Sequence, residues 1–471
     1  MKNLSLFLAI FVFSFSLNAQ IINIPDPNFK NKLLASTTSN SIALNASGIS
    51  IKIDTNTNGE IEVSEIQNVF ALNASTSTIN TTNDIFDMSG IQNFTNLKVL
   101  KCDGNQLTSL DLTGMINLEE VRCNDNQLSN FAISGLSNLK IIDCRDNHLT
   151  SFSPAGFLNL QKLDISNNQI SSLTFTNNPN LITLYCNNNS LTTLDLTAST
   201  NLNVVGCWSN QLTNLNVSGL THIIELECGD NNLGSLNVSG LSTLGILGCG
   251  GNSLTSIDVS SLSSLWVLNC NLNPLTAINV SGLTALRQLF ISNTSVPTID
   301  CSQSGVEQLF ASNNPNLVNI NVQNNHFSSS DPDMLYFAFK FENNPALTSI
   351  CVDNGEQNNL AYTDYNSTGN VVVYTGPTCS TVLMAVDGFE KGSALSLYPN
   401  PANHTITLDL KNNNQANSIH IYNVLGQLVQ SVPNQVEDTS ITFDVSELKT
   451  GTYFINVISD KGKSTSKFIK L

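Results

Sequence analysis

Residues 97–117 read LKVLKCDGNQLTSLDLTGMIN, and the same pattern of residue types returns eight more times, ending with LWVLNCNLNPLTAINVSGLTA at residues 265–285. Each of the nine blocks is 21 residues long. Position 1 holds Leu or Ile, position 4 an aliphatic residue, position 9 Asn and position 11 Leu or Ile. Position 6 holds Cys in eight blocks and Ile165 in the remaining one. A fixed period of this length indicates one supersecondary unit stacked on copies of itself.

The pattern L-x-x-L-x-C-x-x-N-x-L resembles the leucine-rich repeat family over residues 97–285. Positions 4 and 6 alternate with other residues, so both side chains point inward from a short strand. The Asn of position 9 turns the chain out of that strand, and its amide can bond buried turn backbone between blocks. Stacked strands of this kind predict a parallel sheet along the concave face of a curved solenoid.

The second half of each block also alternates, as in LTSLDLTG at residues 107–114. Because 21 residues leave little room for a helix, we expect a mostly extended or 3-10 convex side. After Ala285 the period loosens, and YFAFKFENN at residues 336–344 restores the pattern once more. Terminal repeats commonly drift in this way. We therefore place the repeats at residues 97–352, a C-terminal cap at 353–380 and a linker at 381–394.

Composition and the first residues bear on compartment and partners. Of 471 residues only 12% are charged, and the net charge is −17, which argues against nucleic acid or an anionic membrane surface as partner. Residues 1–19, MKNLSLFLAIFVFSFSLNA, place one Lys before an apolar run and end on a small residue. They predict a secretory signal peptide cut after Ala19. A transmembrane helix is the alternative, but the run is short for one, and we expect no transmembrane segment in the mature chain.

Eleven Cys in an exported chain would ordinarily indicate disulfides. Here eight of them occupy the inward position 6, so we interpret them as small buried hydrophobic residues. A ladder of metal-binding thiolates is the alternative, but no His or second ligand accompanies these Cys. Cys301 is expected to be buried as well. Cys351 and Cys379 fall outside the regular array and are a candidate disulfide closing the C-terminal cap.

Residues 20–96 are expected to form an N-terminal cap. Pro27 and the spacing of Phe29, Leu33 and Leu34 predict a short helix that begins near Asp26. Such a helix can cover the open end of a solenoid, which otherwise exposes a hydrophobic face.

Within this cap, residues 54–65, DTNTNGEIEVSE, fit the EF-hand pattern D-x-[DN]-x-[DN]-G-x₅-E at every defined position. An exiting helix is expected over residues 63–72, whereas the preceding GISIKI looks like a strand, so the segment resembles half an EF-hand. Calcium here would be a structural clamp, and no other cofactor is expected. The alternative is a polar surface turn. The candidate ligands are Asp54, Asn56, Asn58, Glu60 through its carbonyl, Glu62 and Glu65.

Residues 395–471 change character, because the repeats stop and short alternating strands begin. We expect strands at residues 405–410, 418–422, 441–445, 453–458 and 464–471, forming a small Ig-like antiparallel β-sandwich. The order YPNPA, IHIYNVLGQLV, DVSELKTGTYFINV and a basic ending KFIKL resembles the type A C-terminal sorting domain of the type IX (Por) secretion system. The resemblance implies that this machinery carries the chain from the periplasm through the outer membrane of a Gram-negative bacterium and then removes the domain. An ordinary accessory β-domain is the alternative.

Catalysis finds little support. The five His are scattered, and neither H-E-x-x-H, G-x-S-x-G nor a phosphate-binding glycine loop is present. We therefore expect no enzyme. An enzyme that uses carboxylates brought together by folding is the alternative.

Positions 3, 5, 7 and 8 of each block supply the side chains of the concave face. Early blocks place charged residues there, middle blocks aromatic ones and later blocks small and apolar ones such as Gly248, Gly250, Gly251 and Leu272. An exposed aromatic beside glycine-rich blocks suggests a docking surface, although a solvated strand surface with incidental aromatics is the alternative. The candidate ligand-binding residues are Tyr185, Trp208, Arg122, Arg145, Val267 and Phe290.

Leucine-rich repeats serve as binding scaffolds, and that is what the resemblance implies. We expect an exported, non-catalytic protein, adhesin-like or recognising a protein or glycan ligand, at the bacterial surface or outside the cell. The alternatives are a structural protein of the cell envelope and an inhibitor or receptor of a secreted enzyme.

Overall fold

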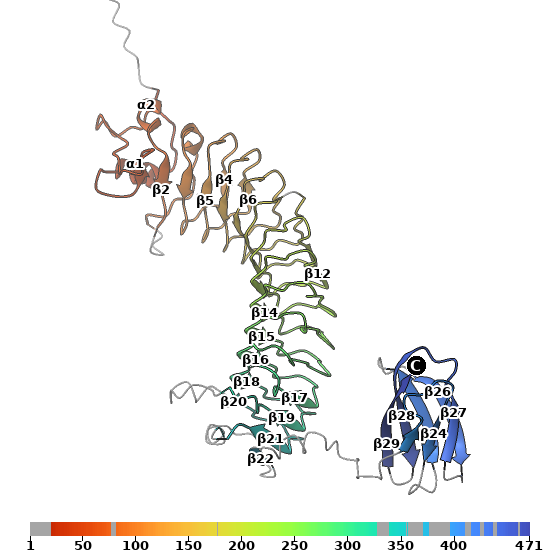
Figure 1. Ribbon diagram of the computed structural model, residues 1–471. Helices are drawn as coiled ribbons and strands as arrows, with labels where there is room; N and C mark the ends of the chain where they lie inside the picture. The colour runs from red at the N-terminus through yellow and green to blue at the C-terminus, as the bar shows by residue number, and fades with distance from the viewer. Residues whose placement is uncertain are drawn as a thin grey trace, which may run out of the picture. The chain divides into compact units, whose positions relative to one another are not determined.

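The computed structural model, shown in Figure 1, describes residues 20–471 except 77–81, 177, 327–338, 355, 357–370, 376–395, 410–415, 424–427, 437–439 and 460–461. The predicted signal peptide and linker lie outside the described residues, as does most of the predicted C-terminal cap. The chain divides into two compact units, residues 1–376 and 377–471.

The first unit is a leucine-rich repeat solenoid, as predicted. A 14-stranded sheet lines its concave face, and all neighbours in it are parallel except β1 (Ala43–Leu44), which pairs antiparallel with β2. Successive strands pair at the same positions of successive blocks, for example Leu184 with Val205. The parallel strands are β2 (Ala71–Asn73), β3 (Val99–Lys101), β5 (Glu120–Arg122), β7 (Ile141–Asp143), β8 (Lys162–Asp164), β9 (Thr183–Tyr185), β11 (Val204–Gly206), β13 (Glu225–Glu227), β14 (Ile246–Gly248), β15 (Val267–Asn269), β16 (Gln288–Phe290), β18 (Gln308–Phe310) and β20 (Phe339–Lys340).

The Asn of position 9 performs the predicted role. The Asn210 side-chain amide donates to the carbonyl of Cys186 in the preceding block at 3.0 Å and to that of Cys207 at 3.1 Å. Its oxygen accepts from the backbone N–H of Leu191 at 3.0 Å. One half-buried side chain thus satisfies backbone groups of two blocks that would otherwise be unpaired.

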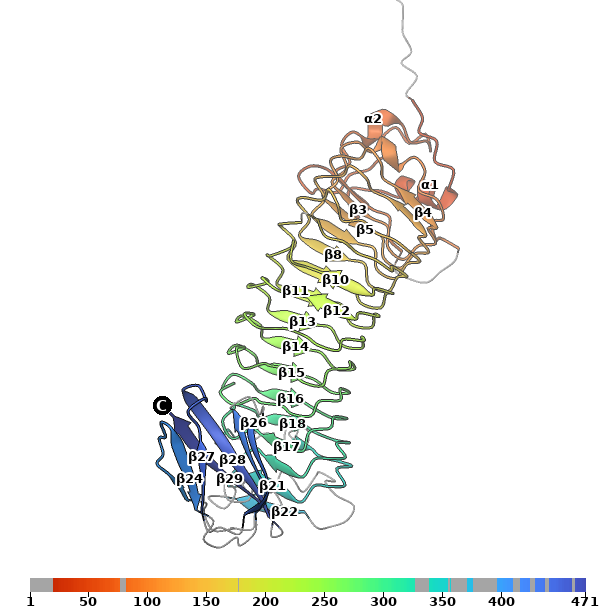
Figure 2. The same cartoon turned by 90° about the vertical axis from the view of Figure 1, so that its right-hand side faces the viewer.

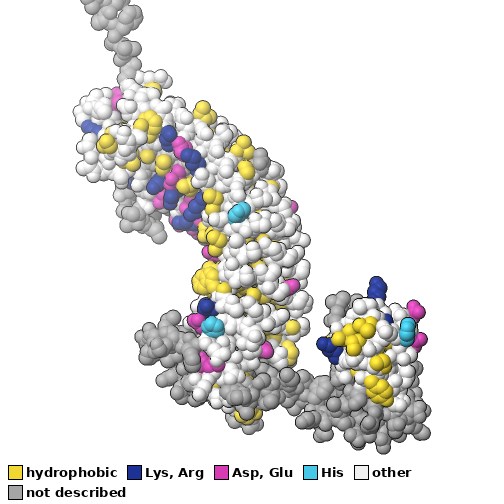
Figure 3. Space-filling view, viewed as in Figure 1, with side chains coloured by type: hydrophobic (Ala, Val, Ile, Leu, Met, Phe, Trp, Pro, Cys, Tyr) yellow, Lys and Arg dark blue, Asp and Glu magenta, His cyan; other side chains and the backbone are white. Residues whose placement is uncertain are grey.

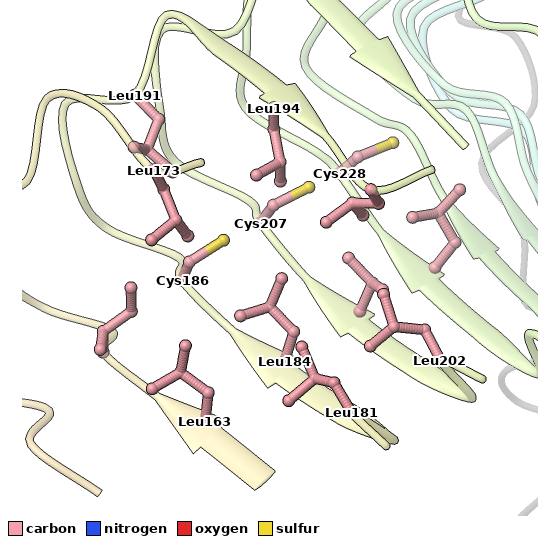
Figure 4. Packing of buried hydrophobic residues seen from close by; sticks show 14 of the residues in the cluster. Leu163, Leu173, Leu181, Leu184, Cys186, Leu191, Leu194, Leu202, Cys207 and Cys228 are labelled. Atoms are coloured by element: carbon pink, nitrogen blue, oxygen red, sulfur yellow. The ribbon is translucent and has the colours of Figure 1, made fainter. Parts of the chain in front are cut away.

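The position-6 Cys side chains are buried in the same core as the position-4 aliphatic residues, as predicted. Figure 4 shows the sulfurs of Cys186, Cys207 and Cys228 stacked one behind another along the core. Burial raises the pKa of Cys186 to about 12, so the thiol stays protonated and packs as an apolar group. In the described part of the chain, no group of three or more His, Cys, Asp and Glu side chains could hold a metal ion.

The convex side is extended, as predicted, and in the described residues between 97 and 375 it contains turns and short strands but no α-helix (Figure 2). These strands form three small parallel sheets, β4–β6, β10–β12 and β17–β19–β21–β22. Their bounds are β4 (Ser109–Asp111), β6 (Asn130–Ala132), β10 (Thr193–Asp195), β12 (Asn214–Asn216), β17 (Thr298–Asp300), β19 (Asn319–Asn321), β21 (Ser349–Val352) and β22 (Val372–Thr375).

The N-terminal cap begins with α1 (Pro27–Leu34), which starts beside Asp26 as predicted, and Asp26 is its N-cap. The Asp26 carboxylate accepts from the backbone N–H groups of Asn28 and Phe29, and its second oxygen accepts from Phe86 and Asp87. The cap is therefore tied to the segment that leads into the repeats through the 3-10 turn η1 (Ile91–Asn93).

The helix expected over residues 63–72 is wrong in extent. Only α2 (Val63–Ile66) is helical, and residues 71–73 form β2 instead. Strand β2 pairs with β1 on one side and β3 on the other, so it continues the concave sheet into the cap. Tertiary pairing outweighs helix propensity in this segment.

The second unit consists of two antiparallel sheets around one core, with Ile406, Ile421 and Phe468 among its buried residues. The five predicted strands are present. Two more, β23 and β26, were not predicted, and β26 carries Pro433, a residue that cannot donate to a strand ladder. The strands are β23 (Ser396–Tyr398), β24 (Thr405–Asp409), β25 (Ala416–Asn423), β26 (Leu428–Val436), β27 (Ser440–Asp444), β28 (Gly451–Ser459) and β29 (Gly462–Lys470). No helix among the described residues of either unit is long and apolar enough to cross a membrane.

Candidate ligand-binding site on the concave face

The first and third residues of each three-residue concave strand face away from the core. On β9, Leu184 is buried, while Thr183 and Tyr185 on either side of it are half-buried. Because the strands are parallel and in register, side chains at equal positions of successive blocks form rows along the sheet. The strand spacing of about 4.8 Å brings neighbouring members of a row into contact.

The first half of the face is charged and internally paired. Figure 3 shows basic and acidic side chains gathered there, with hydrophobic side chains further along the face. Arg122 forms an ion pair with Glu120 at 2.5 Å, and Arg145 lies 3.2 Å from Asp143 and 3.6 Å from Asp164. Burial raises the pKa of Asp143. Two predicted ligand-binding residues, Arg122 and Arg145, are therefore engaged in intramolecular ion pairs, and a ligand would have to compete for them.

The aromatic residues of the middle blocks lie side by side over a glycine. Gly206 is the register partner of Tyr185 on the next strand. A Cβ atom on Gly206 would lie 2.5 Å from Trp208 Cζ3 and 2.7 Å from Tyr185 Cδ1, so both rings rest against this backbone. Lys162 Nζ lies 6.0 Å from the centroid of the Tyr185 ring. Tyr185 and Trp208, both half-buried, thus form one continuous aromatic surface.

Beyond Trp208 the face is hollowed. The hollow has a volume of about 530 Å³. Its floor is backbone, because Gly248 and Gly250 take the place of larger side chains on and after β14. The Glu227 carboxylate lies against Gly248, where a Cβ atom would clash with it. The lining residues are Trp208, Glu225, Glu227, Gly229, Asp230, Gly248, Gly250, Gly251, Asn269, Asn271 and Leu272.

The hollow is acidic. Glu225 and Glu227 are separated by one residue on β13 and therefore point to the same side of the sheet. Burial raises the pKa of Glu227, and the neighbouring charge of Glu225 acts in the same direction. Asp230 follows in the turn after the strand. The sequence analysis placed Trp208, the glycines and Leu272 on the concave face, but it did not single out these carboxylates. The presence of two Glu at positions 3 and 5 of one block could have identified them.

Leu272 stands at the rim with an unusual backbone. Its φ is +55°, in the left-handed region, and 57% of the side chain is exposed. At the same position, the neighbouring blocks have Asp230, Gly251 and Asn293, which adopt this conformation more readily. A left-handed conformation of a bulky residue costs on the order of 1 kcal/mol and is typical of functional sites. Here it places an apolar side chain at the edge of the hollow.

Two further predicted residues extend the face past the hollow. Val267 is half-buried on β15, and Phe290 stacks on Phe310 with ring centroids 4.6 Å apart. Ligand binding by all six predicted residues stays a prediction, with Tyr185, Trp208 and Val267 nearest the hollow and the two Arg in the paired region.

The EF-hand-like loop is closed by its own hydrogen bonds. The Glu65 carboxylate accepts from the backbone N–H of Thr55, and Glu62 accepts from the side-chain amide of Asn58 at 2.6 Å. The Asp54 carboxylate accepts from the backbone N–H groups of Asn58 and Gly59. These bonds bring the oxygens of a calcium loop close together. The same bonds would also stabilise a turn that contains no metal. Calcium therefore stays a prediction.

The candidate disulfide is likewise a prediction. Cys351 is buried in β21, and Cys379 lies outside the described residues.

Comparison with known proteins assigns both units. Residues 396–471 match the family described as secretion system C-terminal sorting domain, and residues 137–177 match leucine-rich repeats in two copies. No curated protein matches the chain. The chain is thus a leucine-rich repeat solenoid followed by a type IX secretion sorting domain, and no catalytic family is among the matches.

The chain is also similar to solved structures, the first of which supports the fold. An internalin, InlF, from Listeria monocytogenes has a TM-score of 0.54 at 20% identity, with 75% of this chain and 99% of that chain covered. The functional domain of InlJ from Listeria monocytogenes, described as including a cysteine ladder, has a TM-score of 0.47 at 22% identity over 96% and 99% of the two chains. YopM from Yersinia enterocolitica has a TM-score of 0.42 at 22% identity over 54% and 53%. Solenoid and sorting domain together indicate an exported protein-interaction protein.

Proposed function

We propose that this protein is an exported, non-catalytic recognition protein, adhesin-like, that binds its ligand in the concave hollow between Trp208 and Leu272. The observation that carries the proposal is the hollow itself, a recess of about 530 Å³ with an aromatic wall, a glycine floor and polar side chains. Concave sites with a few placed polar groups are typical of ligand binding. In this proposal the chain reaches the surface of a Gram-negative bacterium, or the medium, from the periplasm through its sorting domain.

A structural role in the cell envelope is the second candidate. It is favoured by the paired charges of the first blocks, where Lys98, Glu119 and Lys140 form a ladder of ion pairs across neighbouring blocks. A surface whose charges neutralise one another offers less to a partner than the hollow does. The two roles are compatible if the early blocks act as a spacer and the middle blocks as the binding site.

Photocrosslinking tests the binding role because it captures whatever ligand lies against the concave face. In cells that make the full chain, a benzophenone amino acid replaces Val267 on the concave face of the protein. The matched control replaces Thr276, an exposed residue of the same block that lies outside the concave strand. We expect a defined crosslinked product from position 267 only, and its loss when Trp208→Ala is added. Products from position 276 alone, or a product at 267 that survives Trp208→Ala, would exclude the hollow as the binding site.

A further inference from the structure

The three carboxylates of the hollow have no intramolecular counter-charge. Among the described residues, no ion pair or side-chain hydrogen bond reaches the carboxylate of Glu225, Glu227 or Asp230. Glu227 is the most constrained of them because it is half-buried against Gly248. Ionised groups that are removed from water are unfavourable unless they are paired.

This arrangement differs from much of the rest of the face. In the early blocks Glu119, Glu120 and Asp143 each pair with a Lys or Arg of their own or a neighbouring block, and Glu307 pairs with Arg287 at 3.1 Å beyond the hollow. Between Lys162 and Arg287 the sequence has no Lys or Arg at all. The positive charge that would neutralise the hollow is therefore absent from this part of the chain, and a ligand has to bring it.

The walls of the hollow suit a cation that carries an apolar stem. Trp208 borders the same recess as Glu225 and Glu227, and an indole ring attracts ammonium and guanidinium groups. A carboxylate beside it can accept charge-assisted hydrogen bonds from the same group. The glycine floor lets a ligand approach the backbone closely, and Leu272 at the rim offers an apolar contact to a neighbouring side chain.

We propose that the hollow binds a basic peptide segment, with one Lys or Arg side chain entering between Trp208 and Glu227. This inference rests on the proposed function of the concave face. A neutral glycan would cover Glu227 without relieving its charge, which makes it the weaker candidate. A metal ion is also disfavoured, because no group of three or more His, Cys, Asp and Glu side chains in the described residues is arranged to hold one.

Tryptophan fluorescence gives a direct test, because the chain has only two Trp. Trp266 is replaced by Phe in the full chain, which leaves Trp208 as the single reporter in the hollow. The probes are acetylated and amidated tetralysine and tetraarginine, with tetraglutamine, chitohexaose and calcium chloride as comparisons. We expect a saturable change with the two basic peptides alone, and an affinity that falls as salt is added.

Matched charge variants locate the site. Glu225→Gln with Glu227→Gln should weaken tetralysine binding about tenfold or more, since one lost charge pair commonly costs that much. Asp195→Asn with Asp258→Asn removes the same charge from outside the concave sheet and should leave the affinity within about twofold. The parent protein supplies a second measurement that needs no folded variant. Binding should weaken as pH falls through the raised pKa of Glu227, whereas lysine stays protonated.

Several results would overturn the inference. The first is the absence of a fluorescence change with either basic peptide at millimolar concentration. The second is an equal loss of tetralysine affinity in both double variants. The third is saturable binding of chitohexaose or calcium that the Glu225 and Glu227 changes do not affect. The crosslink at position 267 separates this failure from failure of the proposed function. A Trp208-dependent crosslink that tetralysine does not compete away would leave the concave binding site standing and refute only its preference for a cation.

Discussion

Replacement of Asn231 by Ala tests what holds the solenoid together. The buried Asn231 side chain accepts from the backbone N–H of Leu212 at 2.9 Å. Its amide donates to the carbonyls of Cys207, Cys228 and Gly229 at 3.1, 3.1 and 2.9 Å. An orphaned buried N–H costs about 1–3 kcal/mol, and each lost bond to a carbonyl adds about 0.5–1.5 kcal/mol. We therefore expect a loss of about 3 kcal/mol or more in the free energy of unfolding.

Asn232→Ala is the matched control, because the neighbouring Asn232 side chain is exposed. Urea unfolding followed by circular dichroism gives the free energies, and amide hydrogen exchange of the segment around Leu212 shows whether the loss is local, as expected for stacked units. A free energy of unfolding for Asn231→Ala within about 0.5 kcal/mol of that for Asn232→Ala would refute the role assigned to the Asn ladder.

Four further outcomes are expected. Millimolar calcium should raise the Tm of the parent but not of Glu65→Gln, with a Kd near ~10⁻⁴–10⁻³ M as in extracellular modules; identical Tm values with and without calcium would exclude the site. Deletion of residues 396–471 should leave the repeats folded, since they have a separate core, and should trap the protein in the periplasm; normal amounts at the surface in fractionation would contradict this. Trp208→Ala should change stability by roughly 0.5 kcal/mol or less while ligand binding falls by about 2 kcal/mol or more, and the reverse pattern would make Trp208 a core residue. The raised pKa of Glu227 disfavours its ionised form in the folded state, so this penalty is absent below the ordinary Glu pKa and complete above the raised one. Glu227→Gln should therefore raise Tm relative to the parent more at pH 7.5 than at pH 4, and an equal effect at both pH values would show that Glu227 is not destabilising.

The repeat architecture was predictable because its cause is local and repeated. The Asn of position 9, the inward Cys and the aliphatic positions each specify one contact, and nine copies make the period unmistakable. The concave sheet, the extended convex side and the start of α1 near Asp26 followed directly. The helix expected over 63–72 failed because pairing of β2 with β1 and β3 is a long-range effect.

The binding site was less predictable, since it depends on the orientation of side chains and on their contacts with neighbouring blocks. Periodicity placed Tyr185 and Trp208 on neighbouring blocks, but it did not show that both rings rest on Gly206. It also made Arg145 and Trp208 equal candidates for ligand binding, although Arg145 forms ion pairs with acidic neighbours in the structure. The three carboxylates of the hollow, Glu225, Glu227 and Asp230, all lie in one block, but the recess that they line also needs the glycines of the next block.

The Asn ladder also bears on how such a chain changes in length over evolution. The side chain of each ladder Asn bonds to its own block and to the one before it, as that of Asn210 does. Loss or duplication of one whole block therefore rejoins the same bonds, whereas a partial change leaves buried backbone groups unpaired. The 21-residue block is the natural step for insertion and deletion. The hollow is formed by the blocks from Trp208 to Leu272. Insertion or deletion of a block outside that span therefore changes the length of the solenoid and leaves the hollow intact.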